Sequence, residues 1–99
     1  MQASIDNQTL AESDNTVAIE GNSYFPSESV DHSLLETSDT EYQCPWKGDA
    51  QYVDAVIANT RYADIGWSYP DPPKSAIDKV GADFSGYICF DESVVTVKA

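Results

Sequence analysis

The stretch AQYVDAVIA at residues 50–58 constrains the fold of this chain more than any other feature. One phase of its alternation, Val53, Ala55 and Ile57, is wholly apolar, whereas the opposite phase is mixed. Successive side chains of a strand point to opposite faces of a sheet. The pattern therefore predicts a half-buried strand of an antiparallel sheet.

Further strand patterns follow one another at short intervals. They are residues 3–6 and 9–12 around a two-residue turn at Asn7-Gln8, residues 16–20, residues 63–69, and a final hairpin of residues 86–90 and 94–98. Its turn would be residues 91–93. Gly66, inside one of these patterns, indicates a bulge or a close approach of two backbones. Strands thus account for most of the predicted structure.

Helical signals are few and short. Ser27 could cap a turn through residues 28–35, and Ser75 one through residues 76–80 that Gly81 would end. Three prolines in YPDPPK, residues 69–74, exclude regular structure there. We therefore expect an all-β, mainly antiparallel, compact domain with one or two short helical turns. Because 99 residues is the length of one ordinary domain, residues 1–99 should form a single unit.

The charge balance excludes several classes of partner. The chain has 17 acidic and 5 basic side chains, a formal net charge of −12, and its basic residues are scattered singly. Lysine and arginine contacts to phosphate dominate nucleic-acid affinity, so we expect no nucleic acid and no anionic membrane as partner. An acidic face that docks onto a basic protein remains one possible function. The N-terminus lacks a signal sequence and no apolar run approaches about 18 residues, so we predict a cytoplasmic protein.

No metal site or cofactor is predicted. Cys44, Cys89 and the single histidine, His32, do not have the local spacing of zinc ligands. The pairs Glu12 with Asp14 and Asp39 with Glu41 could hold a hard cation if they lie on strands, although such pairs are frequent in so acidic a chain. We expect two free thiols instead.

Whether the chain is an enzyme stays open at this point. A nucleophilic Cys44 would need a nearby base, and only Lys47, three residues further on, offers a charge that could lower the pKa of the thiol.

Aromatic residues gather in the middle of the sequence. Six of the eleven lie between residues 42 and 69: Tyr42, Trp46, Tyr52, Tyr62, Trp67 and Tyr69. Tyrosine and tryptophan combine apolar bulk with a polar group, so several on one side could wall a small-molecule pocket. The alternative is that they fill the core of a small β-domain.

Several short motifs together resemble a known family. YFP (24–26), LLE (34–36), YQCPWKGDAQY (42–52), WSYPDP (67–72) and GYICF (86–90) occur in the order and spacing of the domain of unknown function DUF427, sometimes labelled nucleotidyltransferase-like. The resemblance implies a fold of the Mss4-like or β-tent class. Relatives at that level often hold a four-cysteine zinc, which two cysteines cannot provide. Phosphoryl transfer is not expected, because the sequence has no Gly-Ser turn leading into a pair of aspartates and few basic residues that could hold the phosphates.

The family motif marks the positions Tyr24, Pro26, Glu36, Cys44, Pro45, Lys47, Gly48, Tyr52, Trp67, Tyr69 and Pro70. From these we predict a pocket that binds an unknown small molecule or a protein partner. Tyr24, Pro26, Tyr52, Trp67 and Tyr69 would line it, with Glu36, Cys44 and Lys47 as polar groups. Glu36 and Lys47 could pair across the cleft. The alternative is an enzyme that uses the same cleft, with Cys44 as nucleophile or Glu36 as acid or base.

Overall fold

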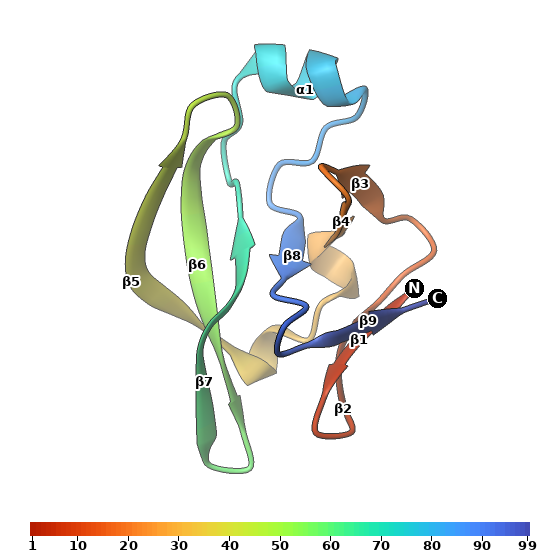
Figure 1. Ribbon diagram of the computed structural model, residues 1–99, viewed down its shortest axis with the longest axis vertical. Helices are drawn as coiled ribbons and strands as arrows, with labels where there is room; N and C mark the ends of the chain where they lie inside the picture. The colour runs from red at the N-terminus through yellow and green to blue at the C-terminus, as the bar shows by residue number, and fades with distance from the viewer.

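A computed structural model describes residues 1–99 as nine strands, one α-helix and two 3₁₀ turns (Figure 1). In chain order the elements are β1 (Gln2–Ile5), β2 (Gln8–Glu12), β3 (Val17–Ile19), β4 (Asn22–Phe25), the 3₁₀ turns η1 (Ser27–Ser29) and η2 (His32–Leu34), β5 (Leu35–Cys44), β6 (Gly48–Ile57), β7 (Thr60–Ser68), α1 (Lys74–Val80), β8 (Ile88–Phe90) and β9 (Thr96–Lys98). The all-β prediction is confirmed, whereas the Mss4-like or β-tent class stays a prediction. No helix is long and apolar enough to cross a membrane.

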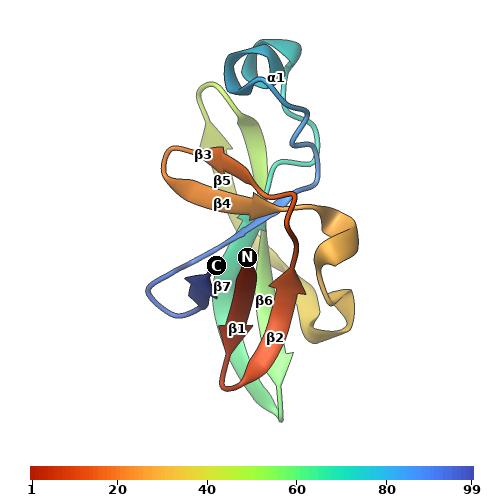
Figure 2. The same ribbon diagram turned by 90° about the vertical axis from the view of Figure 1, so that its right-hand side faces the viewer.

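The strands form two antiparallel sheets. The small sheet has the order β2-β1-β9 and the large sheet the order β3-β4-β8-β7-β6-β5. The small sheet lies beside the lower half of the large one, and α1 lies at the opposite end, near the turn between β5 and β6 (Figures 1 and 2). Strand β5 is thus an outer edge of the large sheet.

The strand that the alternating pattern predicts is β6. Val53, Ala55 and Ile57 are buried in the main core, as expected, and the strand begins two residues earlier than the pattern suggests. Gly66 lies in β7 where two backbones meet closely, because a β-carbon there would be 3.0 Å from the carbonyl oxygen of Cys89. That prediction is also confirmed.

Two-residue turns join three of the hairpins, and both central residues of each have positive φ. Asp6 and Asn7 have φ of 50° and 64°, and Ile5 pairs with Gln8. The first turn is therefore Asp6-Asn7, so the prediction of Asn7-Gln8 is wrong by one residue. Positive φ at both positions matches the right-handed twist of the flanking strands, and Asp and Asn tolerate it better than other side chains.

The predicted C-terminal hairpin is wrong. β8 pairs with β4 and β7 in the large sheet, whereas β9 pairs with β1 in the small one. The amides of Val94 and Val95 both donate to the carbonyl of Asp91, at 3.0 and 2.8 Å. This turn directs the chain away from β8 and toward the other sheet.

The helical predictions are only partly correct. Residues 27–29 and 32–34 form two separate 3₁₀ turns, and Leu35 already belongs to β5. Asp31 caps the second turn by accepting a hydrogen bond from the Ser33 amide at 3.1 Å, whereas the sequence predicts Ser27 as the cap. Helix α1 begins after Pro73 without a side-chain cap from Ser75. Gly81 ends it with a φ of 86°, as predicted.

Buried side chains divide into two clusters. The main core fills the space between the sheets and contains Ala3, Ile5, Leu10, Ala11, Phe25, Val30, Val53, Ala55, Ile57, Ile65, Ile88, Phe90 and Val95. The second core contains Ile19, Tyr24, Cys44, Tyr69, Ala76, Phe84 and Cys89. Ala76 belongs to α1, so the second core lies at the helical end of the molecule.

Candidate functional site

Three of the residues predicted to form the aromatic pocket belong to the second core: Tyr24, Cys44 and Tyr69. Three aromatic rings pack against one another in this core, with centroids 6.2 to 6.5 Å apart: those of Tyr24, Tyr69 and Phe84. The indole Nε1 of Trp67 donates a hydrogen bond to the hydroxyl of Tyr24 at 3.1 Å. Burial raises the pKa of both tyrosines, because the charged phenolate loses its hydration. These rings therefore pack on each other, and none of them lines either of the two hollows described below.

Lys47 is the one charged residue that this cluster buries. Its side chain is only 9% exposed, and Nζ lies 5.2 Å from the ring centroid of Trp46 and 5.1 Å from that of Tyr69. Nζ also forms an ion pair with Glu20 in the turn between β3 and β4. Burial lowers the pKa of Lys47, but the hydrogen bond to Glu20 and the nearby tyrosines outweigh it and raise the pKa overall. The ammonium thus stays charged within an aromatic cage.

The turn that carries Lys47 follows from its local sequence. Residues 45–47 connect β5 to β6, and Gly48 completes the turn with a φ of 95° that side chains rarely adopt. Pro73 lies near Gly48, so the proline-rich segment packs against this turn. Lys79 of α1 adds a second ammonium 4.5 Å from the ring centroid of Trp46.

Glu36 is not part of this cluster. It lies at the far end of β5 from Cys44, roughly 25 Å along the strand at about 3.3 Å per residue. There Glu36 forms an ion pair with Arg61, which also pairs with Asp54 at 3.0 Å. The expectation that Glu36 pairs with Lys47 is therefore wrong, because each has a different partner. Pro26 is buried at the start of η1.

Both cysteines are buried free thiols of the second core. Burial raises the pKa of Cys89 to about 12. The single imidazole, that of His32, contacts Ser27 instead, with Nε2 2.8 Å from the carbonyl oxygen. No group of three or more His, Cys, Asp or Glu side chains is arranged to hold a metal ion.

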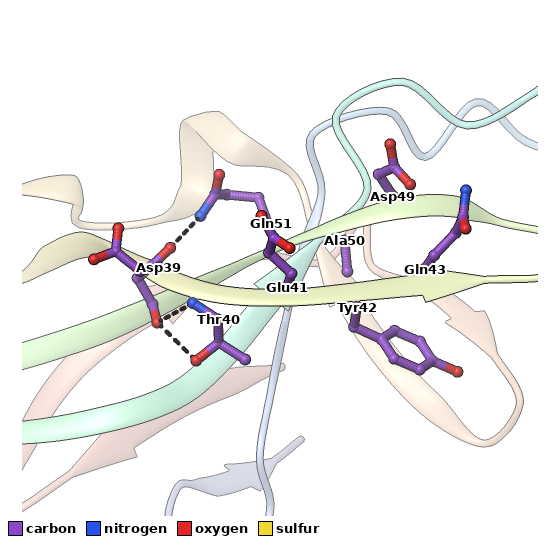
Figure 3. A pocket seen from close by; sticks show the side chains of 9 residues that line it. Asp39, Thr40, Glu41, Tyr42, Gln43, Asp49, Ala50 and Gln51 are labelled. Atoms are coloured by element: carbon purple, nitrogen blue, oxygen red, sulfur yellow. Dashed lines mark hydrogen bonds between the residues drawn. The ribbon is translucent and has the colours of Figure 1, made fainter.

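A surface depression lies elsewhere, along β5 and the start of β6 (Figure 3). This β5 hollow has a volume of about 710 Å³ and is lined by Ser38, Asp39, Thr40, Glu41, Tyr42, Gln43, Asp49, Ala50 and Gln51. A smaller hollow of about 230 Å³ shares Asp49, Ala50 and Gln51 with it and adds Pro70 and Asp71. Of the residues that line the β5 hollow, the sequence singled out the pair Asp39 and Glu41 and the aromatic residue Tyr42.

The charges of the β5 hollow are unbalanced. Asp39, Glu41 and Asp49 line it and take part in no ion pair, and no lysine, arginine or histidine lines it. Tyr42 is 49% exposed, the most exposed of the large apolar side chains. The hollow therefore presents carboxylates and one accessible ring to solvent.

A bulge in β5 shapes the floor of the hollow. The register with β6 shifts between Thr37 and Glu41, which leaves residues 38–40 without regular pairing. Asp64 of β7 holds this segment, because it accepts hydrogen bonds from Ser38 at 2.5 Å and Thr40 at 2.6 Å. These two hydroxyls lower the pKa of Asp64. Gln51 adds a hydrogen bond to the carbonyl of Ser38 at 3.0 Å.

These features define a small two-sheet β-domain with one acidic hollow beside an edge strand and an aromatic core that encloses a lysine. The sequence model of the domain of unknown function DUF427 matches residues 1–99, and the chain belongs to this family. No curated protein matches the chain.

Proposed function

We propose that this chain is a binding domain that takes a positively charged ligand in the β5 hollow. The observation that carries the proposal is the set of three carboxylates, Asp39, Glu41 and Asp49, that line one depression without a cationic partner. By contrast, Glu36 and Asp54 on the same two strands are neutralised by Arg61. A bound cation would reduce the electrostatic repulsion among these three carboxylates, which no basic side chain of the protein neutralises.

The dimensions and composition of the hollow suit such a ligand. A volume of about 710 Å³ falls within the range of roughly 300–1,000 Å³ that is usual for ligand sites. The exposed ring of Tyr42, on the other side of β5 from Glu41, can contact an apolar stem of the ligand that reaches over the edge of the strand. A net charge of −12 attracts cations from a distance and raises the rate of association at low salt.

In this proposal the predicted aromatic residues support the site rather than line it. Tyr24, Tyr69 and Cys44 form the second core at one end of β5, and Trp67 packs against them. Tyr52 pairs with Trp67 on β7 and contacts it at 6.0 Å between ring centroids. They hold the β5–β6 hairpin in place. No catalytic step is assigned to Cys44, Lys47 or Glu36.

A titration with spermidine tests the proposal directly. The protein is labelled with ¹⁵N, and amide shifts are followed at 20 and 200 mM NaCl. We expect the shifts to concentrate on residues 38–43 and 49–51, and the affinity to fall at the higher salt. The triple variant Asp39→Asn, Glu41→Gln, Asp49→Asn should bind more weakly, by about two- to fivefold for each carboxylate removed.

The matched control is the triple variant Glu12→Gln, Glu28→Gln, Glu92→Gln. It removes the same charge from three exposed side chains that neither line the hollow nor form ion pairs. Equal weakening in both triple variants would mean that spermidine senses only the net charge, and the proposed site would then be wrong.

A further inference from the structure

Strand β5 buries almost nothing, which is unusual for a strand of its length. Only Cys44 of its ten residues is buried, and seven of the eight residues from Glu36 to Gln43 are exposed. A strand of an antiparallel sheet commonly packs one face on the core, as the neighbouring strand β6 does through Val53, Ala55 and Ile57. β5 is held mainly by its pairing with β6, so one edge and most of its two faces are open.

A second copy of this chain does not fit that edge. Pairing of two β5 strands would bring Glu36, Asp39 and Glu41 of each copy together, and both copies carry a net charge of −12. Charged side chains and bulges are the devices by which edge strands avoid self-association. The bulge at residues 38–40 adds to this protection. The same carboxylates would attract a strand of opposite charge.

We propose that the ligand of the β5 hollow is an extended polypeptide segment that adds as a strand along residues 41–44, with lysine or arginine at every second position. This inference rests on the proposed function and names its ligand. Strand addition uses main-chain hydrogen bonds for affinity and alternate side chains for specificity. The segment is short, because the bulge interrupts β5 on one side and the turn at residues 45–47 ends it on the other.

The alternation of β5 explains the spacing of the basic residues. Glu41 and Gln43 point to one side of the strand, together with Asp49 and Gln51 of β6, whereas Tyr42 points to the other side (Figure 3). Residues of an added strand would alternate in the same way. Lysine or arginine at positions i and i+2 would lie beside Glu41 and Gln43, on the face that also carries Asp49 one strand further in, and the residue between them would lie on the face of the Tyr42 ring.

Three probes separate this inference from the proposed function. The first is a capped pentapeptide of alternating lysine and threonine, the second is the same peptide N-methylated at alternate amides, and the third is spermidine. N-methylation keeps the charges but removes the donors that strand addition requires. We expect the unmodified peptide to bind at least about tenfold more tightly than the methylated one, since several hydrogen bonds are lost.

Hydrogen exchange gives a second measurement on the same complex. Saturation with the unmodified peptide should slow the exchange of β5 amides between residues 41 and 44, while the methylated peptide should not. Equal affinity of the two peptides, with the charge dependence intact, would overturn strand addition and leave a simple cation site. Failure of all three probes to bind would overturn the proposed function as well.

Discussion

Lys47 and Glu20 form an ion pair that joins the turn between β5 and β6 to the turn between β3 and β4. The two partners differ in exposure, because the lysine side chain is 9% exposed and that of the glutamate 56%. The pair connects the two edge regions of the large sheet over the second core.

The different exposure of the two partners predicts which substitution lowers the free energy of unfolding more. Glu20→Gln leaves a buried ammonium without a counter-ion, and we expect it to lower the free energy of unfolding by about 1–2 kcal/mol. Lys47→Met removes the charge and keeps an apolar stem between Trp46 and Tyr69, so it should cost less. Urea unfolding followed by tryptophan fluorescence measures both.

The double variant checks the mechanism. Once Lys47 is methionine, the further change Glu20→Gln should have almost no effect, because no buried charge remains to be neutralised. If the two single effects simply add, the ion pair does not explain them. Glu28→Gln, at an exposed carboxylate without an ion pair, is the control for the loss of one charge.

Gly66 leads to a steric prediction. An added β-carbon would lie 3.0 Å from the Cys89 carbonyl oxygen and 3.1 Å from the Cγ2 of Val53. Gly66→Ala should therefore lower the free energy of unfolding by about 2–3 kcal/mol, as overpacking of a core does. Gly81→Ala, where nothing lies within 4 Å but φ is positive, should cost about 1 kcal/mol. Thermal and urea unfolding would contradict the prediction if Gly66→Ala proved the milder change.

The bulge of β5 should make stability depend on pH. The pKa of Asp64 is lowered in the folded protein by the hydroxyls of Ser38 and Thr40. A lowered folded pKa stabilises the protein above the unfolded value of about 4 and loses that contribution as the pH falls through the folded pKa. Asp64→Asn should thus be less stable than the wild type at pH 6, and the difference should shrink below pH 4.

Unfolding by urea at several pH values between 2 and 7 measures this difference. In a background of Ser38→Ala and Thr40→Val the Asp64 substitution should lose most of its effect, because its hydrogen-bond donors are gone. A difference that stays constant down to pH 2 would argue against the role given to the Asp64 carboxylate.

The thiol of Cys89 should be inert in the folded protein. Burial raises its pKa to about 12 and leaves the residue 1% exposed, so almost no thiolate is present at pH 8. Iodoacetamide should modify Cys89 only after urea is added, as mass spectrometry of the digested protein would show. Rapid modification of Cys89 in buffer alone would mean that the second core opens readily.

Strands with one apolar and one polar face were the predictable part of the fold. Val53, Ala55 and Ile57 identified β6 because one face of that strand is buried and the other is not. Most of β5 was not predicted, because LETSDTEYQC has polar residues on both faces and forms a strand only by pairing with β6. The residues around Asp91 resemble a hairpin turn, so nothing local indicated that β9 joins another sheet.

The candidate site was less predictable than the fold. Tyr24, Cys44, Lys47, Trp67 and Tyr69 do come together, as the family motif suggested, but their side chains fill a core. Composition alone does not distinguish a pocket from a core, since both need aromatic side chains. The β5 hollow depends on a bulge and on the absence of covering residues, and neither property has a local sequence signal.

The pairing of β1 with β9 has a consequence for synthesis on the ribosome. Strand β1 is the middle strand of the small sheet, and its residue Gln2 pairs with Lys98, so one side of it stays unpaired until the final strand has been translated. At about 5–20 residues per second that delay is roughly 5 to 20 seconds. During this interval Ala3 and Ile5 lack their final covering, so the nascent N-terminal hairpin exposes apolar surface.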